Sequence, residues 1–368
     1  MAGFLVRAML TALFFLGCFS FVSAKDRMTS SILIGNARID IRIEGSTLRI
    51  PTKDVLRWVK SAAESVAAYY GRFPIPQVLI RITPFKGRGV YSGMTFGDQG
   101  ARILIRVGNE TSPSEFASDW MLTHEMVHLA FPSMDEKHHW IEEGIATYVE
   151  PIARIQAGNL TAEQMWLDLV RDMPQGLPQV GDHGLDHTHT WGRTYWGGAL
   201  FCLLADVEIR RQTNNAKGLE QALRAILDAG GDIRKEWNLE DALRIGDRAV
   251  GVNVLEPLYT RMKDNSVNVD LGSLWTQLGV QSDGAGVRFN DNATLAAVRR
   301  AITTRESAPP QPRYSLCLAF RRRYCEMAWR LVSSVSYRVD SGGESTRRIA
   351  AKSETRRKLP KLTVNPRH

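Results

Sequence analysis

The sequence predicts an α+β fold in which a small antiparallel sheet near the N-terminus precedes a largely helical region. Apolar and polar residues alternate in short runs over residues 31–51, 77–83 and 101–107, and such alternation is typical of strands that bury one face. After residue 112 the apolar residues recur instead with helical spacing. Because strand signals come first and helix signals follow, a sheet packed beside a group of helices is expected.

Turn and breaker residues delimit the N-terminal elements. Residues 31–51 are expected to form a hairpin with its turn at residues 44–46, which read Glu-Gly-Ser. A helix is predicted over residues 53–70, because it follows Pro51 and stops at Gly71. Between the strands at residues 77–83 and 101–107, a glycine-rich loop is expected over residues 87–100.

The middle of the chain begins with a helix that has a clear start signal. Ser112 and Glu115 form a capping box, with Pro113 at the first helical position. This helix should run through His128 and end before Pro132, since the residue preceding a proline resists helical geometry. Further helices are expected over residues 139–157, 199–211, 218–229, 238–245 and 254–263.

Charge is concentrated at the C-terminus. The chain of 368 residues has a formal net charge of +8. Residues 311–368 hold 14 Lys and Arg against 4 Asp and Glu, and Arg7 adds one positive charge, so residues 25–310 carry a net charge of −3. The body of the chain therefore gives no electrostatic reason to expect a nucleic-acid partner.

The first 24 residues resemble a signal peptide. Arg7 supplies a positive charge ahead of an apolar stretch over residues 8–22, which is short for a membrane span. The small residues Ser23 and Ala24 suit a cleavage site, so the mature chain is expected to start at Lys25. We therefore expect an exported protein, periplasmic or secreted, with an uncleaved anchor as the alternative.

The last 58 residues, 311–368, differ in composition from the rest, with clusters of Arg and many Ser and Gly. We expect a basic, disordered tail that either contacts an anionic membrane or cell-wall polymer or has no function. Cys317 and Cys325 lie in this tail and could pair in an oxidising compartment, although their spacing does not require it. Cys202 is expected to be a buried free thiol.

A metal-binding pattern lies inside the helix that follows Ser112. His124 and His128 are separated by one helical turn, so both imidazoles can reach one metal ion from the same face. Glu125 lies at the neighbouring edge of that face, where it can act on a water without ligating the metal. The alternative is two core histidines, which are costly to bury unless they are paired or metallated.

The third ligand separates the classes of zinc peptidase. A metzincin would need a glycine and then a histidine where this chain has Phe131 and Met134. Instead, residues 140–148 match the pattern W-x-x-E-G-x-A-x-Y, and here the sequence resembles the gluzincins, closest to the glycyl and alanyl aminopeptidase families. The resemblance implies that Glu143 is the third ligand to a single Zn²⁺. Glu142 is the competitor, because it lies about 100° away on the same helix.

Tyr195 lies in a second matching stretch, residues 195–200, Tyr-Trp-Gly-Gly-Ala-Leu. The aminopeptidase families have a Tyr at a similar helix start, and the resemblance implies that its phenol stabilises the oxyanion of the tetrahedral intermediate. A phenol suits that role because it is a neutral donor at pH 7. A core tyrosine at a helix start is the alternative.

Several other polar residues near the motif have open roles. His183, His187 and His189 precede Tyr195 on a polar loop, where one could line the cleft or all could face solvent. Glu150, two turns after Glu143, could support a metal ligand or face solvent.

The resemblance implies a thermolysin-like zincin core: a small antiparallel sheet, a pair of helices that forms the zinc site, and a helical C-terminal lobe. Four parts are then expected: a signal peptide, 1–24; a strand-rich part with the substrate-edge strand, 25–111; a zincin helical catalytic domain, 112–310; and the tail, 311–368.

The expected function is hydrolysis of peptide bonds by an exported zinc peptidase, with Glu125 as general base. In the alanyl aminopeptidases a G-x-M-E-N motif supplies a Glu that grips the substrate's free amine, whereas residues 93–96 of this chain read Gly-Met-Thr-Phe. An amino-terminal exopeptidase is therefore not supported, and exo or endo preference stays open, as does the oligomeric state. The alternative is a catalytically silent zinc protein that binds cell-envelope peptides or proteins.

Overall fold

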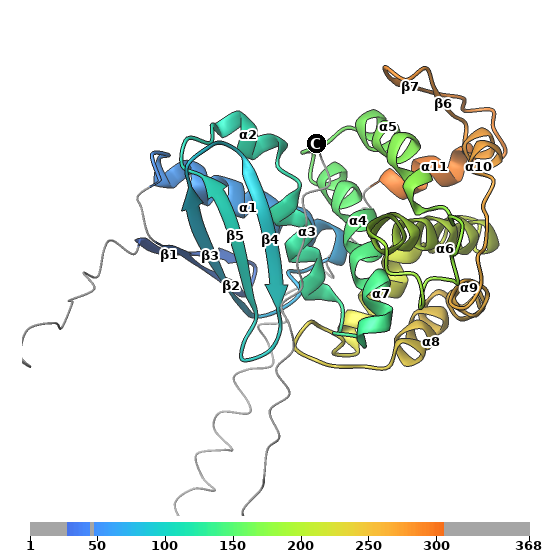
Figure 1. Cartoon of the computed structure of the whole chain (residues 1–368), viewed down its shortest axis with the longest axis horizontal. Helices are drawn as coiled ribbons and strands as arrows, with labels where there is room; N and C mark the ends of the chain where they lie inside the picture. The colour runs from blue at the N-terminus through green and yellow to red at the C-terminus, as the bar shows by residue number, and fades with distance from the viewer. Residues whose placement is uncertain (1–27, 45–47, 305–368) are drawn as a thin grey trace, which may run out of the picture. The chain divides into compact units, whose positions relative to one another are not determined.

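A five-stranded sheet forms one side of the computed structural model, and helices pack against one of its faces (Figure 1). The structure describes residues 28–44 and 48–304, which belong to one compact unit. The expected signal peptide, the basic tail and both tail cysteines lie outside the described residues. In spatial order the strands are β1 (Met28–Ile34), β2 (Ala37–Ile43), β3 (Gln77–Phe85), β5 (Arg102–Gly108) and β4 (Val90–Phe96).

The sheet is mixed, which corrects the expectation of an antiparallel one. The β1–β2 and β4–β5 pairs are antiparallel, whereas the β2–β3 and β3–β5 pairs are parallel. Helix α1 (Thr52–Tyr70) connects β2 to β3. Such a crossover returns the chain to its starting end, so the second strand runs in the same direction as the first.

Two further expectations about the sheet were wrong in detail. The hairpin turn lies at residues 35–36, Gly-Asn, rather than at the expected residues 44–46, because the second strand already begins at Ala37. Gly-Asn between two apolar runs is itself a hairpin signal that the sequence offered. The segment expected to be a glycine-rich loop, residues 87–100, contains β4, which forms one edge of the sheet.

The inner face of the sheet is a row of β-branched residues. Positions 39, 41 and 43 of β2, 78, 80 and 82 of β3, and 103, 105 and 107 of β5 are all Ile or Val and are almost completely buried. Each such side chain contributes roughly 1.5–3 kcal/mol when it leaves water. Helix α1 covers this face with Val55, Val59 and Val66, which recur at helical spacing.

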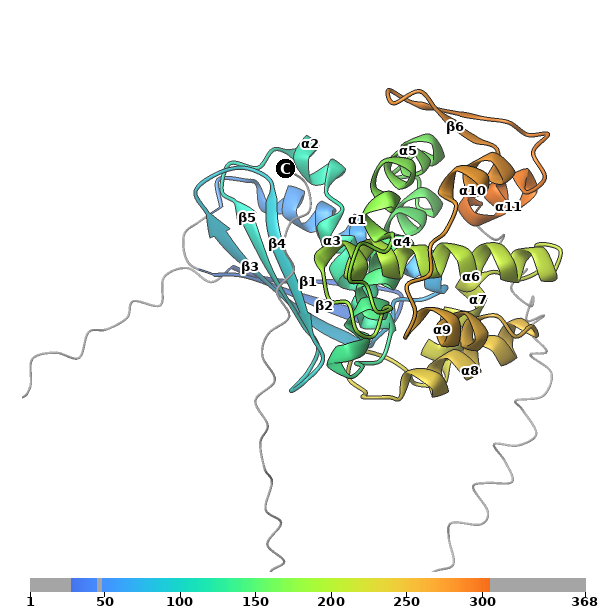
Figure 2. The same ribbon diagram turned by 45° about the vertical axis from the view of Figure 1, so that its right-hand side comes forward.

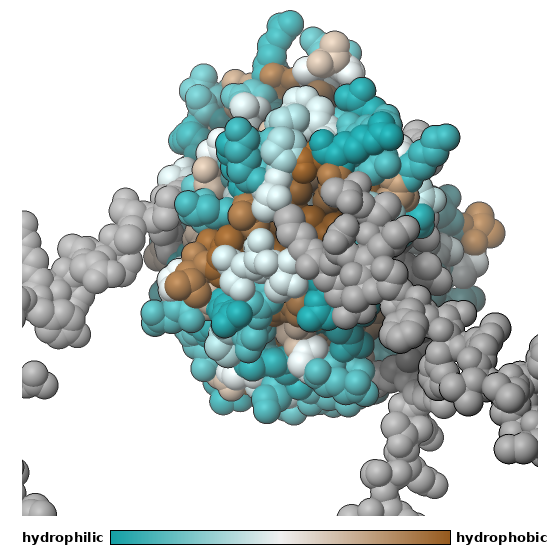
Figure 3. Space-filling model, turned by 90° about the vertical axis from the view of Figure 1, so that its left-hand side faces the viewer, coloured by the Kyte–Doolittle hydropathy of each residue, from teal (hydrophilic) through white to brown (hydrophobic). Residues whose placement is uncertain are grey.

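The opposite face of the sheet carries apolar and basic side chains together. Figure 3, which views the protein from the side of the sheet, shows a hydrophobic band crossing a largely hydrophilic surface. The outward positions include the half-buried Leu79, Leu104 and Met94, with Arg42 and Arg106 on the same face. The alternation predicted from the sequence therefore holds for β2, β3 and β5.

Helix α4 (His139–Gln156) lies between the sheet side of the protein and the remaining helices (Figure 2). It is buried along most of its length and contacts α1, α3 and α6. None of the helices in the described ranges is long and apolar enough to cross a bilayer. The other elements after α4 are α5 (Ala162–Asp172), α6 (Gly198–Gln212), α7 (Leu219–Asp228), α8 (Leu239–Val250), α9 (Leu255–Met262), α10 (Leu271–Leu278), β6 (Val280–Ser282), β7 (Val287–Phe289) and α11 (Ala296–Thr303).

The helix expected from Ser112 through His128 is broken in two. It forms α2 (Pro113–Ser118), which has the predicted capping box, and α3 (Met121–Val127). Asp119 explains the break, because its carboxylate accepts hydrogen bonds from the backbone N–H groups of Met121 and Leu122 at 3.1 and 3.2 Å. A side chain that caps new N–H groups starts a new helix rather than continuing the old one.

Candidate metal centre

The three predicted metal ligands come together between α3 and α4. The Nε2 atoms of His124 and His128 lie 3.2 and 3.5 Å from Oε2 of Glu143. One ligand atom from each residue lies within 4.8 Å of the other two. His124 and Glu143 are almost completely buried, and His128, which starts a 3₁₀ turn over His128–Ala130, keeps a small exposed edge. Helical spacing therefore places both imidazoles on the face that meets α4.

The two adjacent glutamates, Glu142 and Glu143, have different partners. Glu142 turns away from the imidazoles of α3, and its carboxylate accepts a hydrogen bond from the backbone N–H of Met134 at 3.2 Å. Its other oxygen lies 3.3 Å from Nδ1 of His139. Glu143 is the residue that faces His124 and His128, as the motif register implied.

Electrostatics keep Glu143 in the form that binds a cation. Burial acts to raise the pKa of its carboxyl, but the His128 and His124 imidazoles outweigh burial and hold that pKa well below its usual range. Burial acts in the opposite sense on His124, lowering its pKa, and the Glu143 carboxylate outweighs it and raises the pKa. The two groups therefore stabilise each other's charge when no cation is present.

Glu125 is held beside the ligands without joining them. Its side chain is fully buried, and Thr95 of β4 donates a hydrogen bond to Oε2 at 2.6 Å. Oε1 is buried and has no hydrogen-bond partner among the described residues. Burial raises the pKa of this carboxyl. A Cβ atom on Gly93 would lie 2.6 Å from Oε1, so glycine at this position is what lets β4 approach Glu125.

Tyr195 lies against the metal ligands on a π-helical turn, Arg193–Gly197, that precedes α6. Its ring stacks on His124 with centroids 6.3 Å apart and on Trp191 with centroids 5.6 Å apart. Burial, followed by the charges of Glu143 and Glu125, raises the pKa of the phenol, so Tyr195 is neutral at pH 7. π-Helical turns of this kind are frequent at functional sites.

Two glycines bring the turn that carries Tyr195 against α4. A Cβ atom on Gly144 would lie 2.4 Å from Cα of Gly198, and a Cβ atom on Gly198 would lie 2.1 Å from the carbonyl oxygen of Trp140. No other residue type fits either position without moving a backbone. This close contact of two backbones explains why glycine occupies position 144 in the Glu-Gly stretch and position 198 in the Gly-Gly-Ala stretch.

Comparison with known proteins places this geometry in a known fold. No protein-family model and no curated protein matches the sequence. A solved structure described as an aminopeptidase N family protein from Idiomarina loihiensis matches with a TM-score of 0.53 and 13% identity, over 70% of this chain and 50% of that one. The chain has a gluzincin-type, aminopeptidase-like fold. An M1 zinc metallopeptidase from Deinococcus radiodurans has a TM-score of 0.44 and 14% identity, over 66% of this chain and 52% of that one. The chain thus spans about half the length of these proteins.

In this fold the candidate ligand set suits zinc. Two imidazole nitrogens and one carboxylate oxygen form one of the donor sets of catalytic zinc sites, which leave a further position open. The donors are buried and close together, and the unpaired Oε1 of Glu125 lies beside them. The residues present therefore fit zinc, with His124, His128 and Glu143 holding it.

The histidine-rich loop before Tyr195 does not contribute to the site. His187 lies 2.8 Å from Oδ1 of Asp264, and none of His183, His187 and His189 lines the pocket beside the ligands. Glu150 does not face open solvent either; it is buried and pairs with Arg154 at 2.9 Å.

Two aspartates on that loop form contacts that sequence reasoning missed. Asp186 accepts hydrogen bonds from the indole N–H of Trp140 at 2.7 Å and from the Tyr259 hydroxyl at 2.8 Å, and lies 3.1 Å from Nδ1 of His138. Asp182 forms a buried ion pair with Arg193 at 2.7 Å, at the start of the π-helical turn. Aspartates in a polar loop carry no sequence signal for burial, since the partners come from distant elements.

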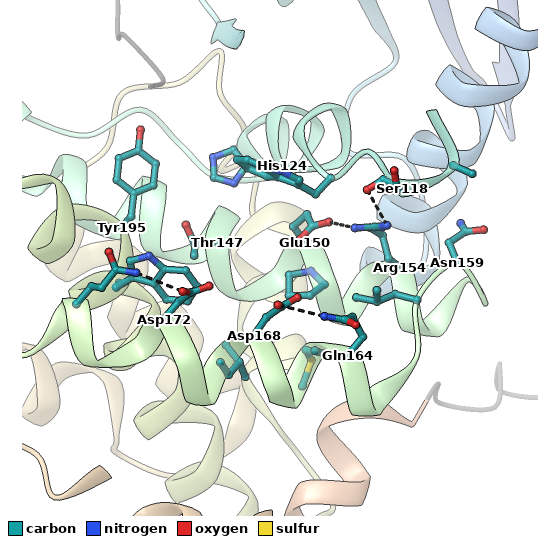
Figure 4. Close-up of a pocket in the computed structure, with 18 of the residues that line it drawn as sticks. Ser118, His124, Thr147, Glu150, Arg154, Asn159, Gln164, Asp168, Asp172 and Tyr195 are labelled. Atoms are coloured by element: carbon teal, nitrogen blue, oxygen red, sulfur yellow. Dashed lines mark hydrogen bonds and ion pairs between the residues drawn. The ribbon is translucent and has the colours of Figure 1, made fainter. Parts of the chain in front are cut away.

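A pocket of about 560 Å³ opens beside His124 and Tyr195. Figure 4 shows it running from Tyr195 past His124 and Glu150 to Arg154 and Asn159, with α5 below. Pockets of this size take drug-sized or peptide-sized ligands. The pocket is therefore large enough to take a ligand next to the candidate metal centre.

Proposed function

We propose that this protein is a zinc-dependent peptidase that hydrolyses peptide bonds with Glu125 as general base. The observation that carries the proposal is the meeting of His124, His128 and Glu143 with Glu125 beside them, in a fold shared with an aminopeptidase N family structure. Zinc, when bound, lowers the pKa of a water toward about 7 and polarises a substrate carbonyl.

The chain's own residues supply proton transfer. Thr95 holds one oxygen of Glu125, and the other is left to take a proton from the attacking water. Because burial raises the pKa of Glu125, the carboxylate is a stronger base than an exposed one, and the protonated acid can return the proton to the leaving nitrogen.

Tyr195 is proposed to stabilise the developing oxyanion. Its phenol is kept neutral by burial and by two nearby carboxylates, so it can donate a hydrogen bond where negative charge appears. The stacking of its ring between His124 and Trp191 limits its rotation, which aims the hydroxyl before substrate arrives.

The edge strand β4 offers a way to hold an extended substrate. It is the terminal strand of the sheet, and Gly93 and Thr95 on its inner face contact Glu125. A peptide that adds to this edge by main-chain hydrogen bonds would run past the general base. We further propose that the enzyme acts outside the cytoplasm, which the leader-like composition of residues 1–24 supports.

Replacing the general base tests the mechanism directly. Glu125→Gln should retain zinc and lose at least ~100-fold in peptide hydrolysis, because a general base contributes about 10²–10⁴-fold. Glu64→Gln, at an exposed position of α1, is the matched control and should keep full activity. If zinc-loaded protein cleaves no peptide in a library, the alternative of a silent zinc protein that only binds peptides is supported. Full activity in Glu125→Gln would contradict the assignment of Glu125 as general base.

A further inference from the structure

The pocket beside the metal centre has an aromatic and aliphatic lining. Trp191 stacks on Tyr195, and Trp120 packs edge-on against His124 with ring centroids 5.5 Å apart. A tryptophan therefore lies beside each of these two site residues. The apolar residues that line the pocket include Trp120, Trp191, Trp196, Leu160, Met165 and Leu169. Indole faces and branched aliphatic groups bind bulky apolar side chains.

Every carboxylate that lines this pocket already has a cationic partner. Glu150 pairs with Arg154 at 2.9 Å, and both are buried. On α5, Asp168 and Asp172 point into the pocket (Figure 4), and Arg171 lies 2.8 Å from Asp168 and donates to Asp172 at 2.9 Å. A paired carboxylate gains little from a second cation and loses its first partner by turning to it.

The hydrogen-bonding capacity that remains in the pocket is neutral. Two buried polar atoms of the lining have no partner among the described residues, the hydroxyl of Thr147 and the indole N–H of Trp191. Both suit a peptide group or a neutral side chain rather than a charge. A charged substrate group would therefore lose its hydration here without compensation.

We propose that this pocket selects a bulky aromatic or aliphatic residue beside the scissile bond, and that the bond lies inside a chain rather than next to a free amino terminus. An amino-terminal ammonium near the metal would need an unpaired carboxylate. Glu125 and Glu143 are committed to the proton and to the metal, and each of the three carboxylates of the pocket already forms an ion pair, Glu150 with Arg154 and both aspartates with Arg171. Thr95, whose hydroxyl is engaged by Glu125, adds no charge on the β4 side. This inference rests on the proposed peptidase function.

A peptide series tests the selectivity. Zinc-loaded full-length protein is given peptides of one length that carry Phe, Leu, Lys or Glu beside the bond, each with an acetylated or a free amino terminus, and cleavage sites are mapped by mass spectrometry. We expect kcat/KM to be at least ~10-fold higher for Phe and Leu than for Lys and Glu, within the range that one side-chain pocket can discriminate. Acetylation of the amino terminus should change kcat/KM by less than ~3-fold. Removal of single residues from free amino termini only, or a preference for Lys or Glu, would overturn the inference.

Binding to Glu125→Gln separates this inference from the peptidase proposal. The affinity of the zinc-loaded variant for the same peptides can be measured by calorimetry even if the wild-type protein hydrolyses none of them. The acetylated Phe peptide should bind at least ~10-fold more tightly than its Lys counterpart. Equal affinities, or no binding of either peptide, would contradict the inference.

Removing the exposed Arg171 should change the selectivity in a defined direction. The side chain of Arg171 is 53% exposed, so Arg171→Gln unmasks Asp168 and Asp172 with little expected effect on folding. In this variant, the ratio of kcat/KM, or of affinity, for the Lys peptide to that for the Phe peptide should rise several-fold. Arg211→Gln, which breaks a similar exposed pair with Glu208 on α6, is the control and should leave the ratio unchanged. An unchanged ratio in Arg171→Gln would contradict the claim that the pairing of Asp168 and Asp172 with Arg171 excludes cationic side chains.

Discussion

At the scale of single residues, the site combines groups whose charge states are set by their neighbours. Glu143 is kept ionised by two imidazoles, Glu125 is made more basic by burial, and Tyr195 is kept neutral by burial and nearby carboxylates. Perturbed pKa values of opposite sense within one small site are typical of acid–base chemistry.

The role of Tyr195 can be tested by removing its hydroxyl alone. Tyr195→Phe should retain zinc and substrate affinity and lose about 10²–10³-fold in kcat, the usual contribution of one oxyanion donor. Steady-state kinetics on the best peptide from the library gives kcat and KM separately.

Tyr70→Phe provides the matched control, since the Tyr70 hydroxyl is buried in the core without a hydrogen-bond partner among the described residues. That variant should have wild-type kinetics. A loss in Tyr195→Phe confined to KM would show that the phenol binds substrate and does not act on the transition state.

The residues of the candidate site were the most predictable part of the protein. His124, Glu125 and His128 lie within one helical turn, so local spacing alone determines that they share a face. Glu143 could be named only through the resemblance of its helix to a family, because periodicity does not distinguish it from Glu142. Asp182 and Asp186 were missed since their partners come from other elements.

At the scale of elements, the helix and strand signals were reliable where the pattern is local. The capping box at Ser112 is present as predicted, but the helix ends early because Asp119 caps a new one. The parallel pairing of β2, β3 and β5 could not be predicted, since the order of strands depends on contacts between distant segments. β4 was not predicted, because Gly93, which the approach of this strand to Glu125 requires, weakens the strand pattern.

Asp186 connects the loop before Tyr195 to α4 and α9, and its removal should be measurable as a loss of stability. Burial acts to raise the pKa of Asp186, but hydrogen bonds from His138, Trp140 and Tyr259 outweigh it and lower the pKa below the ordinary 3.8. A carboxyl with a lowered pKa stabilises the fold above its ordinary pKa, and this contribution fades as the pH falls through the lower, folded value.

Asp186→Asn should therefore reduce the free energy of unfolding by about 1–3 kcal/mol at pH 7, the usual contribution of hydrogen bonds to a charged group. The difference between wild type and variant should shrink below about pH 4. Urea unfolding of both proteins at pH 7 and pH 3 measures this difference in the free energy of unfolding. Asp98→Asn, at an exposed position, is the control. A difference that is the same at pH 7 and pH 3 would show that the charge of Asp186 does not contribute.

At the scale of the whole molecule, the site lies where the sheet and the helices meet. β4 supplies Thr95 and Gly93, α3 and α4 supply the metal ligands, and the turn before α6 supplies Tyr195. The class of fold was predicted correctly, as a sheet beside a helical lobe with a gluzincin-type core. Export and the basic tail stay predictions, because residues 1–27 and 305–368 lie outside the described ranges.

We propose that the imidazoles of His124 in α3 and His128 in the following 3₁₀ turn bind a single zinc ion together with the Glu143 carboxylate of α4. The most direct test is zinc content and affinity per folded chain for wild type, Glu143→Gln and Glu142→Gln, measured by metal analysis and competition with a chelator. We expect one zinc in the wild type and in Glu142→Gln, and an affinity at least ~100-fold weaker in Glu143→Gln, since even residues that only support a ligand contribute about 10–100-fold. Folded wild-type protein without zinc affinity, or zinc lost from Glu142→Gln and retained by Glu143→Gln, would contradict it.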